Sequence, residues 1–217
     1  QTKKETFTSR TSEKIRAEFG VIGGASMIDL KFKTATSSNI FYNFTTIDFE
    51  NNISFAGGAT LNLVFPRNNG KLSFYNELFY CSDVSNYDYK EYYNNGYFQL
   101  HSISIGGYYI KLNNMLRYKY PIGDLFCFGN AGISNGLAFK EVNKAIGVDR
   151  YNNQTAIIEK KFLDNTNSYE QGWLLGAGLL YKCYSIEFRM EICSGMSNYP
   201  SLSSLANRYD LLFGYKF

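Results

Sequence analysis

The sequence predicts an all-β fold, an eight-stranded antiparallel up-and-down barrel that spans a membrane. The first observation is composition, because the 217 residues include 19 Tyr, 18 Phe and 19 Gly, and aromatic residues favour strands. The second is alternation of bulky apolar with small or charged residues, the period of a strand. The third is that short and long connections alternate, which predicts three short periplasmic turns and four long extracellular loops.

The first three strands are expected at residues 15–24, 53–65 and 71–82. Between the first two, residues 27–51 are rich in Thr, Ser and Asn and lack sustained alternation, so they are expected to form a long loop in which the strands can extend. The segment P-R-N-N-G at 66–70 combines residues that favour tight turns, so the second and third strands should form a hairpin.

The middle of the chain predicts two more strands. Residues 83–100 form a second long connection crowded with Tyr, followed by a strand that ends near residue 120. The segment P-I-G-D at 121–124 predicts a short turn into a fifth strand at 125–139.

A third long loop is expected at residues 141–169, with room for one helical turn near 156–161. A very short turn near 183–185 and a last loop at 194–206 separate the remaining strands. These three strands are expected at 171–182, 184–193 and 208–217.

The two faces of these strands decide between a soluble and a membrane barrel. A soluble lipocalin-like barrel or sandwich would bury the bulky apolar face, whereas a membrane barrel turns it to lipid and encloses the polar face. The bulky face is free of charge on residues 53–65, 184–193 and 208–217, which favours the membrane barrel. The polar face then predicts an interior charge network, made of Arg16, Glu18, Glu77, Lys111, Arg117, Glu187, Arg189, Glu191, Asp210 and Lys216, with Lys119, Lys182 and Arg208 on the same face.

This network predicts a closed lumen. The interior of an eight-stranded barrel is just wide enough to be filled by side chains, and buried charges of opposite sign are expected to pair. A pore is therefore not expected. Closure should pair the last strand with the first, bringing Lys216 toward Arg16 and Glu18.

Other functional classes find little support. A formal net charge of +3 is too small to argue for nucleic-acid binding. The four Cys residues lack metal-type spacing, so neither a metal nor a cofactor is expected, and any disulfide pairing stays open. Residues 1–13 are expected to be a flexible periplasmic lead-in after signal-peptide cleavage, and residues 14–217 a single barrel domain.

No catalytic residues are predicted. The single His, His101, has no recognisable nucleophile beside it. Glu187 and Glu191 share a strand face with Arg189 between them, which predicts ion pairing rather than acid–base work. The chain is expected not to be an enzyme, although a barrel enzyme acting on lipid or peptide stays an alternative.

Four segments carry a family resemblance. They are E-F-G-V-I-G-G at 18–24, Y-I-K-L-N-N-M-L-R-Y-K-Y-P at 109–121, F-G-N-A-G-I at 128–133 and the aromatic last strand. With them the chain resembles the small outer-membrane β-barrel family of Bacteroidota called PorT-like, and is similar in architecture to OmpX-type barrels. It departs from the family at Asn114, where a Pro is usual.

The resemblance implies location and partners. It implies the bacterial outer membrane, contact with outer-membrane lipid and lipopolysaccharide, and a non-enzymatic accessory role in a larger complex for secretion, barrel assembly or nutrient uptake. A free-standing surface barrel with adhesive or protective loops is the alternative. The last strand matches the C-terminal signal read by the barrel-assembly machinery, through Tyr209, Leu211, Phe213, Tyr215 and Phe217.

The Tyr-rich connection is the candidate partner-binding loop. Tyr supplies rigid, amphipathic contact area and is enriched in interfaces. The same residues could instead extend a hairpin above the membrane or belong to the interfacial aromatic girdle. They are Tyr87, Tyr89, Tyr92, Tyr93 and Tyr97.

Overall fold

A computed structural model describes residues 14–36, 42–92, 98–151 and 154–217. These residues contain ten strands and two short 3-10 helices, η1 (Tyr42–Thr46) and η2 (Arg67–Gly70), neither long and apolar enough to cross a membrane. The strands are β1 (Arg16–Thr34), β2 (Ile53–Val64), β3 (Leu72–Ser82), β4 (Ser85–Tyr92), β5 (Phe98–Ile122), β6 (Leu125–Tyr151), β7 (Gln154–Lys160), β8 (Tyr169–Tyr181), β9 (Tyr184–Cys193) and β10 (Leu202–Lys216).

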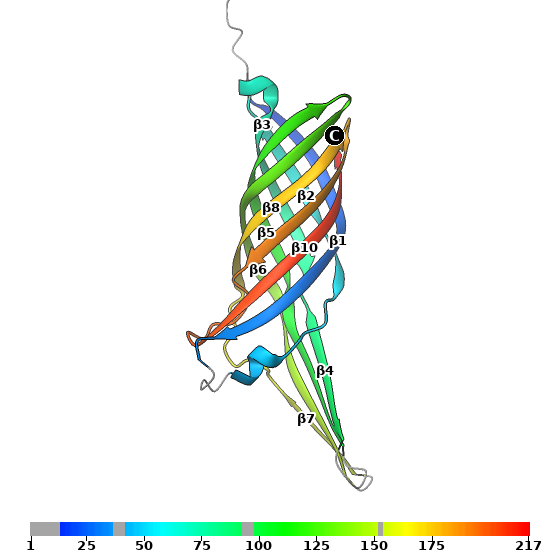
Figure 1. Ribbon diagram of the computed structural model, residues 1–217, viewed down its shortest axis with the longest axis vertical. Helices are drawn as coiled ribbons and strands as arrows, with labels where there is room; N and C mark the ends of the chain where they lie inside the picture. The colour runs from blue at the N-terminus through cyan, green and yellow to red at the C-terminus, as the bar shows by residue number, and fades with distance from the viewer. Residues whose placement is uncertain (1–13, 37–41, 93–97, 152–153) are drawn as a thin grey trace, which may run out of the picture.

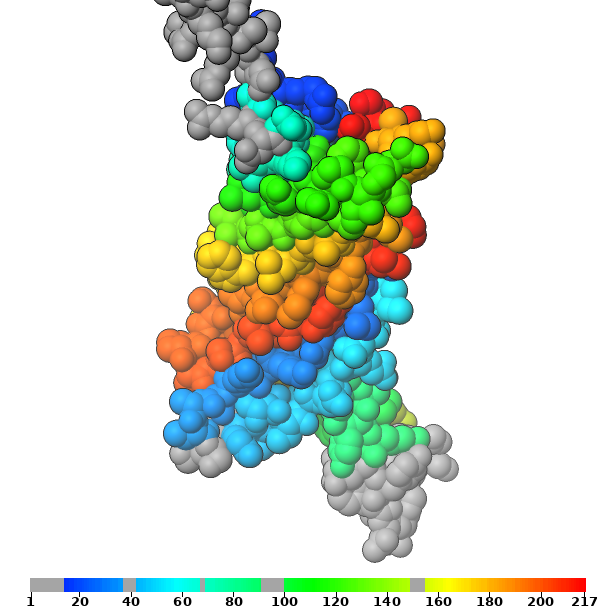
Figure 2. All heavy atoms as spheres, turned by 45° about the horizontal axis from the view of Figure 1, so that its top comes forward, coloured from blue at the N-terminus to red at the C-terminus, as the bar shows by residue number. Residues whose placement is uncertain are grey.

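Eight of the strands close into a ring, which confirms the predicted fold. The ring order is β1, β2, β3, β5, β6, β8, β9 and β10, with every neighbouring pair antiparallel. β10 pairs back with β1 in a register that sets Lys216 opposite Gly20 and Leu202 opposite Thr34. Figure 2 shows this seam, where the blue start of the chain lies beside its red end. All backbone edges within the ring are thereby satisfied.

The two ends of the barrel differ. The turn end, as named here, carries the three tight connections around η2, Gly123 and Lys182, and the C-terminus lies there (Figure 1). The loop end carries the four longer connections, and β4 and β7 project from it (Figure 1). Gly123 and Lys182 both have positive φ, 59° and 54°, a backbone conformation typical of two-residue hairpin turns.

The predicted boundaries of the loops were partly wrong. β1 continues to Thr34, a strand extension that the expected loop at 27–51 had left open. β5 and β6 continue past the ring, and β4 and β7 pair with their outer edges to form a four-stranded sheet. The helical turn expected at 156–161 is strand β7 instead. In each case a partner strand supplies hydrogen bonds that local composition does not reveal.

The exterior of the ring is an apolar band between two groups of aromatic rings. At the turn end Tyr184, Tyr215 and Phe217 contact each other, with centroids 5.3 and 5.5 Å apart. At the loop end Tyr80 and Tyr108 flank Phe139 at 6.3 and 6.2 Å. Between these groups the outward positions of the described ring strands carry no charged side chain.

The height of this band matches a membrane. The outward residues of β5 run from Tyr108 to Tyr120, and roughly twelve residues at ~3.3 Å each, tilted by ~45°, span about 28 Å. Asn76 and Asn114 are polar exceptions inside the band. They face each other across β3 and β5, and the Asn114 amide donates to the Asn76 oxygen at 2.7 Å, which reduces the cost of placing amides in hydrocarbon.

The polarity of the outward and inward faces of β1 is reversed toward the loop end. Near the turn end its outward residues are apolar, such as Phe19 and Val21, which are 60% and 47% exposed. Past Met27 the outward residues are Asp29, Lys31 and Lys33, and the inward ones become apolar. The outward residues of β1 are therefore apolar in one half of the strand and charged in the other. Such a change marks the edge of a membrane, because the barrel surface contacts lipid on one side of it and water on the other.

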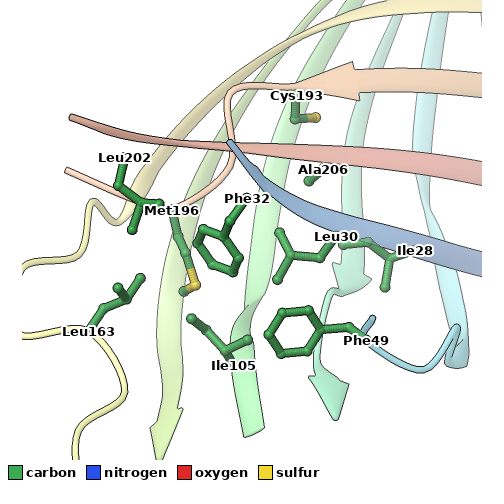
Figure 3. Packing of buried hydrophobic residues seen from close by; sticks show 10 residues of the cluster. All are labelled: Ile28, Leu30, Phe32, Phe49, Ile105, Leu163, Cys193, Met196, Leu202 and Ala206. Carbon is green, nitrogen blue, oxygen red and sulfur yellow. The ribbon is translucent and has the colours of Figure 1, made fainter. Parts of the chain in front are cut away.

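The inward apolar residues at the loop end form a plug, shown in Figure 3. Ile28, Leu30 and Phe32 of β1 pack there with residues from the connecting segments and from β5, β9 and β10. The other members are Phe49, Ile105, Leu163, Cys193, Met196, Leu202 and Ala206. Phe32 and Phe162 each contact both Phe44 and Phe49 and also each other, with ring centroids 4.6 to 6.5 Å apart. All four Cys residues are free thiols.

Candidate functional site

The lumen between the plug and the turn end is filled by two clusters of buried charge. In the first, Arg189 of β9 donates two hydrogen bonds to the carboxylate of Glu77 on β3, at 2.7 and 2.8 Å. β3 and β9 are four strands apart in either direction around the ring, so this pair spans the lumen. Arg189 also donates to Glu187 at 2.8 Å, and Asn113 donates to Glu77 at 3.0 Å.

Arg117 completes the first cluster. Its guanidinium donates to Glu187 at 3.0 Å and to the Asn130 oxygen at 2.8 Å. It also lies between two aromatic rings, 3.5 Å from the centroid of Tyr75 and 4.2 Å from that of Phe128. Such stacking suits a guanidinium, which is planar and weakly hydrated. Two Arg and two Glu therefore balance in charge and fill the cross-section.

The second cluster lies between the first cluster and the plug. The Lys111 ammonium donates to Glu170 at 2.8 Å and to Glu191 at 3.0 Å. Arg208 of β10 pairs with Glu191 on the adjacent strand and reaches across to Asp83, at the end of β3. Each of these five side chains is at most 3% exposed, so pairing is what makes their burial tolerable.

Three groups of the second cluster have the donor types of a metal site. Glu170, Glu191 and Cys193 place their ligand atoms within 4.8 Å of one another. The Lys111 ammonium already contacts all three, at 2.8, 3.0 and 3.6 Å. The positive charge of Lys111 thus takes the place that a cation would fill, and the cluster is fully explained as an ion-pair network.

Asp210 lies between the networks on the seam strand. It is 1% exposed and stands opposite Ser26 of β1 and Arg189 of β9. At the turn end, Glu18 forms a third group, bonded to Arg16 at 2.8 Å, Lys216 at 3.3 Å and the Asn62 amide at 2.9 Å. Closure of β10 on β1 therefore brings Lys216 to Glu18.

All ten residues of the predicted interior network lie on inward faces of the ring strands, although Arg16 reaches the rim and is exposed. Glu187 pairs with Arg189, but Glu191 turns to Lys111 and Arg208 instead. The prediction placed Arg208 on the inward face but omitted Asp83 and Glu170. Glu170 continues the inward alternation of β8, a signal that a longer strand would have captured. Asp83 lies beyond β3 and gives no such signal.

The candidate partner loop is part of a hairpin formed by β4 and β5. Tyr89 is 44% exposed, whereas Tyr87 packs on the plug with its ring 6.2 Å from that of Phe49. Tyr92 ends β4, and Tyr93 and Tyr97 lie outside the described residues. The predicted assembly-signal residues follow the outward face of β10, with Phe213 and Phe217 exposed by 59% and 76%.

His101 lies in β5 beyond the ring. It is exposed, opposite Tyr89 of β4 and Gly147 of β6. Among the described residues, the nearby Ser104 hydroxyl donates to Asn86 and not to an imidazole. A base and nucleophile in hydrogen-bond contact, as covalent catalysis needs, are not assembled here.

Comparison with known proteins finds matches among solved structures only. No protein-family model matches the chain, and no curated protein matches it significantly. Among solved structures, OprG, the outer membrane protein from Pseudomonas aeruginosa, matches at 12% identity over 94% of this chain and 97% of that chain, with a TM-score of 0.43. Neisserial surface protein A matches at 9% identity over 93% and 99%, with a TM-score of 0.42.

The attachment invasion locus protein of Yersinia pestis, in complex with the heparin analogue sucrose octasulfate, matches at 11% identity over 93% and 99%, with a TM-score of 0.37. At such scores the fold of this chain rests on its own strand pairing, which closes an antiparallel ring.

Proposed function

We propose that this chain is a closed, non-enzymatic outer-membrane barrel that serves as an accessory subunit, with its projecting sheet as the contact surface for another envelope protein. The observation that carries the proposal is the contrast between a filled lumen and an exposed sheet. The lumen is blocked by two ion-pair clusters and an apolar plug, so transport through it is not supported. At the loop end the projecting sheet offers the outer edge of β7, which pairs with no described strand other than β6.

The membrane placement is supported by the exterior. Trp173, Phe55 and Phe213 are 73%, 67% and 59% exposed in an uncharged band, which in water would be an aggregation-prone surface. The ionic interior also disfavours a soluble lipocalin-like binder, whose ligand cavity would be apolar. The aromatic residues at both edges fit the girdles that mark membrane interfaces.

The projecting sheet has the properties of a protein-binding element. Its order is β4, β5, β6 and β7, and none of the residues that the structure describes pairs with the outer edge of β7. Ile157 and Ile158 of β7 are 70% and 57% exposed, on opposite faces of the strand. An exposed edge flanked by apolar side chains is a template for a strand from another chain.

The resemblance to PorT-like barrels supports the same class of role. Subunits of complexes for secretion, barrel assembly or nutrient uptake would use such a sheet as a docking element. A free-standing surface barrel with adhesive or protective loops is the second candidate, supported by the exposed Tyr89 on the same sheet.

Site-specific photo-crosslinking in the native cell tests the proposal. A photoreactive amino acid at Ile157 or Ile158 is expected to capture a defined envelope protein. The control position is Ser203, which is exposed on β10 at the same end of the barrel and should capture none. Absence of any protein crosslink from β7 in intact cells, with correct barrel insertion, would favour the free-standing candidate.

A further inference from the structure

A cavity of about 530 Å³ opens at the turn end of the lumen. Its lining includes one carboxylate, Glu18, and six cationic side chains. The cations are Lys14, Arg16, Lys71, Lys119, Lys182 and Lys216. This cavity, the basic mouth, therefore concentrates positive potential at the floor and rim of a concave surface.

Glu18 neutralises only part of this charge. Its carboxylate bonds to Arg16 at 2.8 Å and to Lys216 at 3.3 Å, and it also accepts from Asn62. With these three bonds its hydrogen-bonding capacity is largely used. The remaining cations of the basic mouth have no carboxylate of their own among its lining residues.

Lys119 is the least satisfied of these cations. It is 9% exposed and points inward from β5. Its ammonium makes no hydrogen bond or ion pair with any of the described residues, whereas the deeper cations Lys111, Arg117 and Arg189 are all paired. Burial of an unpaired cation is costly, and an anion that enters the mouth would remove that cost.

We propose that the basic mouth binds a phosphate group, with Lys119 at its base and Arg16 and Lys216 at its side. A phosphate presents several oxygens in different directions and accepts charge-assisted bonds from separate cations at once. Beside the cations, Phe65, Phe126 and Leu180 give the cavity an apolar wall, which suits the carbon part of a phosphate ester. The site would thus take a phosphate ester, either a phospholipid headgroup or a soluble compound.

Two observations bear on the occupant. Residues 1–13 of this chain carry Lys3, Lys4 and Arg10 against Glu5 and Glu13, so the lead-in adds one net positive charge. Lys71 lies over the ring of Tyr120 at 5.6 Å and Lys182 over that of Tyr181 at 5.1 Å. These ammonium groups therefore lie at the aromatic edge of the apolar band, the level of lipid phosphates.

The test uses the full chain, purified in an uncharged maltoside detergent. One arm titrates glycerol 3-phosphate by calorimetry at low ionic strength. The other measures retention of phosphatidylglycerol by native mass spectrometry, against diacylglycerol of the same chain length. Binding in the first arm identifies a soluble ester, and binding in the second alone identifies a headgroup; both support the site. Failure of both phosphate sources overturns it, even if a Glu-rich peptide binds.

Three variants test whether the phosphate binds in the basic mouth. K119Q is expected to weaken binding by about tenfold, the effect of losing one charge-assisted bond. E18Q is expected to tighten binding severalfold, because it frees Arg16 and Lys216. K33Q removes a charge at the loop end and should change nothing. Equal losses in K119Q and K33Q would overturn the site, and so would an E18Q affinity no higher than wild type, which decides the matter if K119Q does not fold.

Discussion

Arg189 and Glu77 lie on opposite walls of the barrel, 112 residues apart in sequence, and are joined by two hydrogen bonds of 2.7 and 2.8 Å. Both side chains are fully buried. A bidentate pair across the lumen acts as an internal brace, because it connects strands that share no backbone hydrogen bonds. The same residues close the lumen to ions.

The brace should be revealed by a double-mutant cycle. R189M alone leaves the buried Glu77 carboxylate without its cation, whereas Glu187 keeps Arg117, and it is expected to destabilise the barrel by about 3–5 kcal/mol, as for broken buried pairs. E77Q/R189M removes the Glu77 charge and should recover part of the loss. Unfolding in detergent, followed by heat-modifiable gel mobility, measures both. Additive losses would show that the two residues are not coupled.

The lumen should not conduct. Purified barrel in a planar bilayer is expected to show no steady current, because two charge clusters and the plug block the path in series. F32A/M196A, which hollows the plug alone, should stay closed because the ion-pair clusters remain. Sustained ohmic steps from the wild-type protein would refute the closed lumen.

The exchange of faces along β1 should be visible by fluorescence. Trp173, the single Trp of the chain, is 73% exposed at the edge of the apolar band. Its emission should be blue-shifted and quenched by lipids brominated near the carbonyl end.

A matched reporter tests the water side. W173F/K31W places the indole among the charged outward residues of β1, where emission should be red-shifted and quenched by iodide rather than by brominated lipid. If the indole of this variant behaved like that of the wild-type protein, the membrane edge would not lie near Met27.

Gly106 should be needed where the projecting sheet leaves the ring. Its φ is +142°, and a Cβ there would lie 1.7 Å from the carbonyl oxygen of Asp83. G106A is expected to cost about 1–3 kcal/mol in strain and to disturb the pairing of Asp83 with Arg208.

Gly123 offers the control. It also has positive φ, +59°, but nothing lies within 4 Å of its would-be Cβ. G123A should therefore cost only about 1 kcal/mol. Thermal unfolding of both variants in detergent measures the difference, and equal losses would mean that the close approach to Asp83 is relieved at no cost.

The sequence alone determined the ring, its two faces and its closure. Alternation of bulky with small or charged residues has the period of a strand whatever the partner, and turn residues at 66–70 and 121–124 mark the hairpins. These signals are local, so they can be recognised in the sequence without knowledge of the fold. They placed Lys216 near Glu18 because an up-and-down barrel has only one way to close.

Only the tertiary structure decided which charges meet. Arg208 reaches Asp83 and Arg189 reaches Glu77 because strand tilt and register set their heights along the axis, and no local pattern encodes height. The same holds for β4 and β7, which are strands because β5 and β6 offer them an edge. The apolar inward residues Ile28 and Leu30 likewise acquire their role as plug from lying beyond the apolar band, where water replaces lipid outside.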